Sequence, residues 1–410
     1  MSMYPLILAF RSLGRNRRRT LVTSGATAFA GFLMIVYSAL VAGMMRTMER
    51  SVIAFEVGDV QLHARGYRDD PDLYRRIDNA TALADRLSKK ESGVYAAPRL
   101  YGGALAAAHE ASAGVEVRGI DLLREPRVTE IASAVWKGQW LSGEDPRGIV
   151  LGKKLARSLG VAIGDEVVLL GQAADGSMAN DAYRVRGVLK SISERADQAG
   201  LFVTEAAFRE LFTLPEGHHE IALTRGHATL ETVESIALAE TRGLPIEVAT
   251  WRTIQPAIAK MIDNSMAGRV IMLLIFYSAI AMVILNATLM SVFERIREFG
   301  IMKAIGVGPW YIGRIVFFEV VLQSCFASLV AIVAGLPLAL FLERHGWDLT
   351  ALAGDMNIAG IAWEPVWYAF VDFETVALPI LFLLVVVSVA SLYPGVKAAI
   401  ISPKEAIYQR

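Results

Sequence analysis

The stretch ERIREFGIMKAIGVGPW, from Glu294 to Trp310, separates two of the most apolar runs of the chain. Its apolar residues recur every three positions, at Ile296, Phe299, Met302 and Ile305. This spacing predicts a short amphipathic helix, and the glycines and proline from 306 to 309 predict where it ends. Such a helix between two membrane spans can anchor in the interface, or it can insert into a groove of a cytoplasmic partner.

Four apolar runs are long enough to span a bilayer, which takes about 20 residues. They predict transmembrane helices at residues 20–45, 269–293, 309–342 and 375–396. The hydrophobic fraction of 54% and the mean hydropathy of +0.42 also indicate a membrane protein. The first run is longer than the apolar core of a signal peptide, which is about 7–15 residues, so we expect it to be retained.

Small residues in the first run predict close helix packing. Thr27 and Gly31 lie four positions apart and therefore on one helix face, as do Ala39 and Gly43.

Two polar side chains lie inside the later runs, Asn286 in the second and Glu319 in the third. Polar groups at membrane depth need partners, so we expect both to have intramembrane structural roles. The runs show no proton or ion path, which argues against an ion-coupled secondary transporter.

Basic residues predict the orientation of the spans. They cluster before the first run, between the second and third, and after the fourth, so all three clusters fall on one side of a four-span protein. The positive-inside rule makes that side cytoplasmic. Residues 1–19 are then a cytoplasmic amphipathic segment, 294–308 a cytoplasmic helix and 397–410 a cytoplasmic tail. Residues 46–268 and the 343–374 loop lie on the opposite side.

Residues 46–268 alternate helix and strand patterns, which predicts an α+β domain. Strand patterns occur at 166–170 and 183–189, and helix patterns at 72–90, 127–135 and 204–212. The most organised part runs from Gly148 to Leu170. There we expect a strand that ends at Gly152, a brief helix, and Gly160 as its left-handed C-cap before the next strand.

Motifs of enzymes and of metal sites are absent from the sequence. There is no Walker A motif (G-x-x-x-x-G-K-[ST]), H-E-x-x-H, C-x-x-C or G-x-S-x-G, and the acidic residues show no catalytic spacing. His218 and His219 point opposite ways on an extended chain and chelate one metal poorly, so a loop without metal is the expectation. The formal net charge of zero argues against a nucleic-acid partner. We expect no catalytic residue, no metal and no cofactor in this chain.

The pattern Arg297-Glu298-x-Gly300-Ile301-x-x-Ala304-x-Gly306 resembles the coupling segment of the FtsX/MacB-type (type VII) ABC transporter permeases. Other matches follow the same order along the chain. Residues 152–167 resemble the MacB-like periplasmic core, Trp251 resembles a tryptophan before the second span, Glu319 matches a glutamate of the third span, and residues 393–407 resemble the closing pattern of the family.

The resemblance implies a fold, a location and partners. The fold is an α-helical membrane domain of four transmembrane helices, with a MacB-like α+β periplasmic domain inserted between helices 1 and 2, in the bacterial inner membrane. The partners are two copies of a separate cytoplasmic ATPase, which bind ATP and Mg, and a second permease chain, identical or homologous. ATP hydrolysis would be passed through the spans to the periplasm, which is called mechanotransmission. The implied coupling residues are Arg297, Glu298, Gly300, Ile301, Lys303, Ala304 and Gly306.

The layout is most similar to the lipoprotein-releasing permeases LolC and LolE, which implies a lipoprotein substrate and a periplasmic carrier. Flexible methionine side chains at the outer ends of spans 1 and 2 would suit acyl chains, although ordinary packing is the alternative. These candidate substrate contacts are Met44, Met45, Met48, Met261 and Met266. The Arg-Glu-Phe-Gly motif fits the broader family better, so MacB-like export of peptides or small amphiphiles and FtsX-like control of a cell-wall hydrolase stay open. A four-span receptor or scaffold without an ATPase is the remaining rival.

Overall fold

The computed structural model describes residues 17–88, 93–348, 356–358, 361–363 and 366–402. Most of the predicted N-terminal segment and of the predicted C-terminal tail therefore lies outside the described residues. The chain divides into two compact units. We call Met1–Thr47, Ile262–Leu349 and Val366–Arg410 the helical unit, and Met48–Met261 with Thr350–Pro365 the globular unit.

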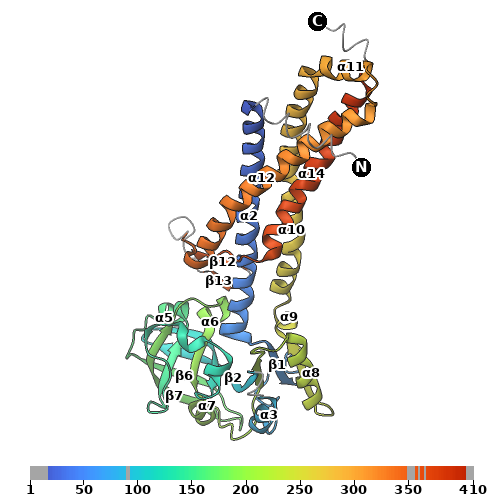
Figure 1. The fold of residues 1–410 in the computed structure, drawn as a ribbon. Helices are drawn as coiled ribbons and strands as arrows, with labels where there is room; N and C mark the ends of the chain where they lie inside the picture. Colours follow the sequence, from blue (N-terminus) through green and yellow to red (C-terminus); the bar gives the residue numbers. More distant parts are fainter. Residues whose placement is uncertain (1–16, 89–92, 349–355, 359–360, 364–365, 403–410) are drawn as a thin grey trace. The chain divides into compact units, whose positions relative to one another are not determined.

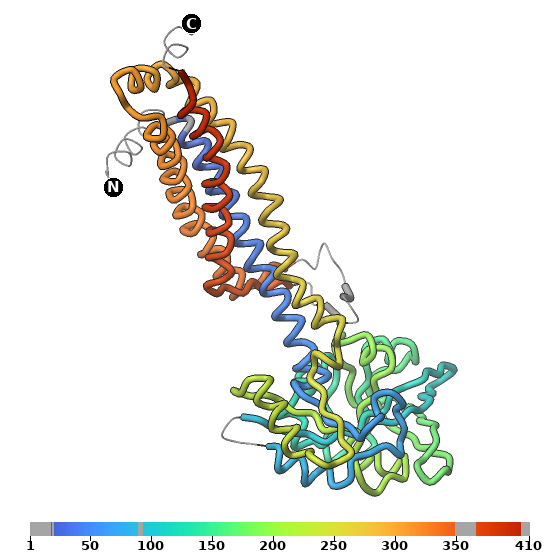
Figure 2. Tube along the Cα trace, turned by 90° about the vertical axis from the view of Figure 1, so that its right-hand side faces the viewer, coloured from blue at the N-terminus to red at the C-terminus, as the bar shows by residue number. Residues whose placement is uncertain are grey.

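Long apolar helices dominate the helical unit and lie side by side in Figures 1 and 2. Among the described residues, four helices are long and apolar enough to cross a membrane. They are α2 (Arg17–Val52), α10 (Pro256–Glu294), α12 (Pro309–His345) and α14 (Phe373–Ile400). Each predicted span lies inside one of them. The helices are longer than the predicted spans, because α10 already begins at Pro256 and a π-helical turn, η1 (Ile53–Val57), continues α2.

Local chemistry explains where these helices begin and how closely they pack. Pro309 is the first residue of α12, where its missing N–H would have no helical partner. Asp372 forms a capping box with Thr375 at the start of α14. A Cβ on Gly31 would lie 2.8 Å from the Cβ of Ala331 in α12, so a glycine is needed for this approach.

Short elements join the long helices. The nine-residue helix α11 (Ile296–Ala304) lies between α10 and α12 at one end of the helical unit (Figure 1). The predicted 343–374 loop contains short strands among its described residues: β11 (Trp347–Asp348) pairs with β14 (Val366–Trp367), and β12 (Met356–Ile358) pairs with β13 (Ile361–Trp363).

One mostly antiparallel sheet organises the globular unit, and among the described residues it has ten strands. Its order is β10-β1-β9-β2-β3-β8-β5-β7-β4, and β6 pairs with β2 and β7. The strands are β1 (Val60–Ala64), β2 (Tyr95–Ala108), β3 (Ala111–Ile120), β4 (Val135–Gly138), β5 (Gly148–Leu151), β6 (Glu166–Gln172), β7 (Met178–Leu189), β8 (Gly200–Thr204), β9 (Glu220–Thr224) and β10 (Ile246–Thr250).

Short helices connect these strands and cover hydrophobic cores. They are α3 (Ala80–Leu87), α4 (Glu125–Val128), the 3-10 helix η3 (Ile131–Ala134), α5 (Lys153–Leu159), α6 (Glu194–Ala199), α7 (Glu205–Leu211), α8 (Leu230–Glu240) and α9 (Trp251–Ile254). Of the two largest cores, one lies around Leu151, Phe208 and Phe212, and the other around Leu62 and Leu87.

The predicted strand–helix–strand unit from Gly148 to Leu170 agrees with β5, α5 and β6, and Gly160 has a φ of 66° at the C-cap of α5. The helix predicted at 72–90 is wrong in its first half, because α3 is the only helix among the described residues of this range. Ile77 instead exchanges backbone hydrogen bonds with His218, and Asn79 has a left-handed φ of 52°.

The helix predicted at 127–135 is also wrong, because the chain turns twice there. It forms the end of α4, then η3 and the start of β4. Between α4 and η3 the backbone N–H of Glu130 bonds to the carbonyl of Ala54 rather than within a helix. A tertiary hydrogen bond thus replaces a helical one.

Candidate functional site

Helix α11 has one buried and one exposed face. Phe299 and Gly300 are buried, and Phe299 packs against Val292 of α10, Ile312 and Val316 of α12, and Ala398 of α14. The predicted apolar stripe is therefore right at its centre, where Phe299 joins three long helices. Ile305 comes after the last residue of α11 and is 77% exposed, so this end of the stripe is not buried.

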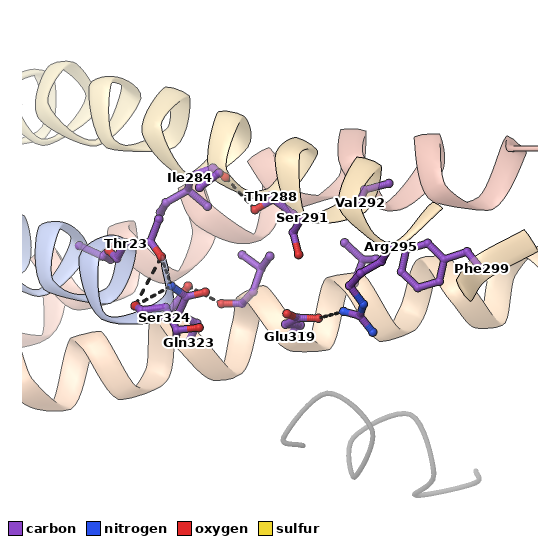
Figure 3. A pocket seen from close by; sticks show the side chains of 15 residues that line it. Thr23, Ile284, Thr288, Ser291, Val292, Arg295, Phe299, Glu319, Gln323 and Ser324 are labelled. Carbon is purple, nitrogen blue, oxygen red and sulfur yellow. Dashed lines mark hydrogen bonds and ion pairs between the residues drawn. The ribbon is translucent and has the colours of Figure 1, made fainter. Parts of the chain in front are cut away.

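Arg295 lies at the junction of α10 and α11 and forms an ion pair with α12. Its Nη1 lies 2.9 Å from the carboxylate of Glu319, and the two side chains are only 17% and 15% exposed (Figure 3). Glu319 therefore has the partner that its position in an apolar helix requires. The sequence analysis missed Arg295 as a functional candidate, because a basic residue at the end of a span is also an ordinary orientation signal.

Lys303, in the last turn of α11, forms hydrogen bonds with the C-terminal end of α14. Its Nζ donates hydrogen bonds to the carbonyl oxygens of Ala399 and Ile401, at 2.7 and 2.6 Å. Carbonyl groups at a helix C-terminus lack helical partners and carry partial negative charge, so an ammonium group suits them. Burial lowers the pKa of Lys303. One ion pair, two hydrogen bonds and one buried aromatic ring thus connect α11 and the preceding Arg295 to the long helices.

Gly306 ends the segment with a φ of 96°, a conformation that favours glycine. The chain then reverses into α12, whose N-cap is Gly308.

A small polar cavity lies beside the Arg295–Glu319 pair (Figure 3). Its volume is about 30 Å³, which is room for one or two water molecules. Hydroxyl and amide side chains of α2, α10 and α12 line it, namely Thr20, Thr23, Thr27, Thr288, Ser291, Gln323 and Ser324. Gln323 donates a hydrogen bond to Thr23, so a polar layer connects α12 with α2 at this depth.

The opposite face of α11 is open to a partner. Arg297, Glu298, Ile301 and Ala304 are exposed, so most of the coupling residues implied by the family pattern lie together on this face. Ile301 is 49% exposed, and Glu298 lies 3.3 Å from Arg295. An apolar side chain flanked by charges on a short rigid helix suits insertion into a groove of another protein.

The other predicted site residues are dispersed. Met44, Met45 and Met261 are half-buried, Met266 is exposed, and Met48 is buried at 1% exposure. Met44, Met45 and Met266 belong to the helical unit, whereas Met48 and Met261 belong to the globular unit. Asn286 lies on the exposed side of α10.

His218 and His219 are buried and occupy defined positions rather than a free loop. His218 lies 3.0 Å from Glu205. Nδ1 of His219 accepts a hydrogen bond from the backbone N–H of Tyr101, and its Nε2 donates one to the carbonyl of Leu73. As expected for adjacent residues, the two rings have different partners.

Family models match both parts of the chain. The MacB-like periplasmic core domain matches residues 20–239, and the FtsX-like permease C-terminal model matches residues 270–403.

Relatives agree with these matches. An uncharacterized ABC transporter permease of Methanocaldococcus jannaschii is 25% identical over 238 residues, which cover 56% of each chain. The lipoprotein-releasing system transmembrane protein LolC of Neisseria meningitidis serogroup B is 22% identical over 407 residues, or 95% of this chain and 93% of LolC. LolE of Haemophilus influenzae is 22% identical over 305 residues, or 72% of each chain.

Among solved structures, the periplasmic region of MacB from Actinobacillus actinomycetemcomitans aligns with a TM-score of 0.36 and 12% identity, covering 49% of this chain and 92% of that region.

The family models together extend over most of the chain, and the one for the periplasmic core alone covers more than half. The chain therefore belongs to the FtsX/MacB-type family of ABC transporter permeases.

Proposed function

We propose that this chain couples ATP hydrolysis by a separate cytoplasmic ATPase to movement of its periplasmic core domain. The observation that carries the proposal is the construction of α11. Its exposed face offers Arg297, Glu298 and Ile301 to a partner, whereas Arg295, Phe299 and Lys303 attach it to α10, α12 and α14. If the ATPase displaces α11, the contacts of Arg295, Phe299 and Lys303 would transmit this displacement to the three long helices.

The proposal includes the topology and the partners that the family implies. The chain would lie in the bacterial inner membrane with both termini in the cytoplasm and with the core domain, inserted between helices 1 and 2, in the periplasm. Two ATPase copies would bind ATP and Mg, since the sequence has no Walker A motif. A second permease chain would complete the complex.

For the substrate, we propose lipoproteins that are lifted from the inner membrane and passed to a periplasmic carrier. The support is the named function of LolC and LolE as parts of lipoprotein-releasing systems, and the alignment with LolC over 95% of this chain. Met44, Met45, Met261 and Met266 are the candidates for contact with acyl chains that are not fully buried.

The coupling role is tested with the reconstituted complex of permease and ATPase. Reversal of both charges (Arg297→Glu with Glu298→Arg) changes the exposed face and also replaces the anion beside Arg295 by a cation. Gly300→Pro breaks the helix itself. We expect either change to lower the stimulated ATPase rate by about tenfold, as loss of a central interface contact does. Exchange of the exposed pair Arg86 and Glu240, 3.3 Å apart in the globular unit, is the matched control and should leave the rate unchanged. Full stimulation in the α11 variants would refute coupling through α11.

The substrate is tested separately in proteoliposomes that contain the complex and a lipoprotein. ATP should release the lipidated protein into the soluble fraction in the presence of its carrier. A variant of the cargo that lacks the lipidated cysteine gives the background. Release that does not depend on ATP would exclude lipoprotein extraction and leave the coupling proposal standing.

A further inference from the structure

A cleft of about 690 Å³ lies in the globular unit, and nothing in the coupling role uses it. Its floor is formed by the neighbouring strands β1, β9, β2 and β3. Ligand sites of proteins commonly have volumes of roughly 300–1,000 Å³. The size of the cleft therefore fits a ligand larger than an ion or a water molecule.

The side chains on the floor are polar although they are buried. Alternate residues of these strands, such as Leu62, Val117 and Ile221, face the hydrophobic cores. The residues between them face the cleft, namely Gln61, His63, Tyr101, Glu116, Arg118 and Glu220. Arg118, His63 and Glu220 are only 6%, 4% and 4% exposed. Replacing buried ion pairs by apolar residues is often neutral or stabilising, so stability alone does not account for this lining.

Two carboxylates of the cleft floor, Glu220 and Glu116, already accept hydrogen bonds from arginine side chains. Glu220 accepts hydrogen bonds from Arg99 at 2.8 Å and Tyr101 at 3.2 Å on one oxygen and contacts His63 at 3.2 Å with the other. Burial alone would raise the pKa of Glu220, but the His63 contact and the charge of Arg99 outweigh it and lower the pKa to about 2. Glu116 accepts from Arg118 and Arg195. Both carboxylates are therefore ion-paired, and the pKa of each is lowered.

Groups of both signs remain available for a ligand. Nη2 of Arg118 lies 3.6 Å from Glu56, which is beyond hydrogen-bonding distance, and Arg195 projects to the rim with its side chain 69% exposed. Asp72 is exposed and supplies a rim carboxylate, whereas Glu56 lies deeper, with its side chain 16% exposed. Nδ1 of His63 is buried and has no hydrogen-bond partner among the described residues. Guanidinium donors and carboxylate acceptors thus face one space.

The geometry points to a binding site for a dipolar ligand of short-peptide size, with a cationic and an anionic group that pair with these carboxylates and guanidinium groups. An acyl chain is a poor occupant, because desolvating so many charged groups against hydrocarbon is unfavourable. The site goes beyond the coupling role of α11 and does not depend on it.

Gly103 provides a test of occupancy. It lies on the floor opposite Glu116 in the β2–β3 pair, and a Cβ there would meet no atom within 4 Å. Gly103→Leu therefore fills the cleft without a backbone clash. Gly114 is the matched control, since it lies on the same face of the same strand pair, outside the cleft, and also has open space around it.

The experiment titrates the full-length protein in detergent with fluorescent tetrapeptides. One peptide carries an arginine and a glutamate, one two arginines and one two glutamates, and lauric acid is the fourth probe. We expect saturable binding of the mixed peptide with a Kd below about 1 mM, weakened about tenfold by Gly103→Leu and by Arg195→Ala and unchanged by Gly114→Leu. Thermal unfolding of each variant checks its fold. If Gly103→Leu does not fold, the binding measured with Arg195→Ala tests the proposal instead.

Three results would overturn the proposal: no saturable binding of the mixed peptide, equal binding by folded Gly103→Leu or by Arg195→Ala, or tighter binding of a single-sign peptide or of lauric acid. None of them bears on the ATPase measurements, so the two proposals fail independently.

Discussion

The ring of His219 is held in one protonation state by two backbone groups. Nδ1 accepts a hydrogen bond from the N–H of Tyr101 at 3.0 Å, and Nε2 donates to the carbonyl of Leu73 at 3.2 Å. A proton on Nδ1 would face the Tyr101 N–H, so the neutral ring is favoured. Burial, with help from the positive charges of Arg76 and Arg209, lowers the pKa of His219 to about 4.

This pKa predicts how stability depends on pH. The unfolded chain binds a proton on this histidine near pH 6.5, whereas the folded chain does so only near pH 4. Stability is therefore complete above pH 6.5 and is lost as pH falls toward 4, by about 2–3 kcal/mol. Thermal unfolding of the full chain should show this slope between pH 7 and 4.

The slope should be smaller in His219→Leu, which has no proton to bind, and unchanged in His227→Leu at an exposed position. Equal slopes in all three proteins would show that His219 is not the titrating group.

Two glycines of α2 have opposite environments. A Cβ on Gly43 would lie 2.0 Å from the carbonyl oxygen of Tyr368, in the segment that precedes α14. The same segment is bound to α2 by the hydrogen bond from Phe370 N–H to the Ala39 carbonyl, at 2.9 Å. A Cβ on Gly25 would meet nothing within 4 Å. The helix pattern is the same at both positions, and only the neighbouring segment differs.

Alanine should therefore have opposite effects at these positions. In a helix, replacing glycine by alanine ordinarily stabilises by about 0.5–1 kcal/mol, which is the expectation for Gly25→Ala. At Gly43 the backbone clash should reverse the sign and cost about 1–3 kcal/mol. Thermal unfolding in one detergent compares the two variants with the wild type. Stabilisation by Gly43→Ala would mean that the segment around Tyr368 does not pack against α2.

Asn286 carries an exposed amide group in α10. It lies in the apolar part of α10 on an exposed side, next to Met282, Val283 and Met290, which are 71%, 47% and 57% exposed. An amide facing hydrocarbon is unfavourable, whereas hydrogen bonds between helices stabilise membrane assemblies by about 1 kcal/mol. The family implies a permease partner. We therefore predict that this side of α10 contacts a second copy of the chain.

Cysteine cross-linking tests this contact, because Cys325 is the only cysteine of the chain and can be removed as Cys325→Ser. In native membranes, Asn286→Cys in this background should form a dimer with a short bismaleimide. Val333→Cys, on an outward position of α12 with 67% exposure, is the control and should stay monomeric. A cross-linked adduct with another permease would mean that the partner is a homologue rather than a second copy of this chain. Equal yields of cross-linked dimer at both positions would indicate random collision and contradict the prediction.

The sequence alone determined the features that depend on neighbouring residues. Apolar runs predicted the four long helices, the three-residue spacing around Phe299 predicted α11, and Gly160 predicted the end of α5. Hydrophobic periodicity and glycine conformation act within a few residues, so they can be read directly. The family pattern added the coupling residues, and four of them lie together on the exposed face of α11, namely Arg297, Glu298, Ile301 and Ala304. Gly300 is buried, Lys303 is half-buried, and Gly306 follows the end of α11.

Tertiary structure decided the contacts between distant parts of the chain. Lys303 bonds to Ala399, 96 positions away, and His63 faces Glu220, 157 positions away. The first half of the helix predicted at 72–90 gave way to a backbone bridge between Ile77 and His218. Strand order and helix packing also determine the partner of Glu319, the burial of His219 and the charged floor of the cleft. Strand order and helix packing depend on which distant residues become neighbours, and local periodicity carries no information about which residues these are.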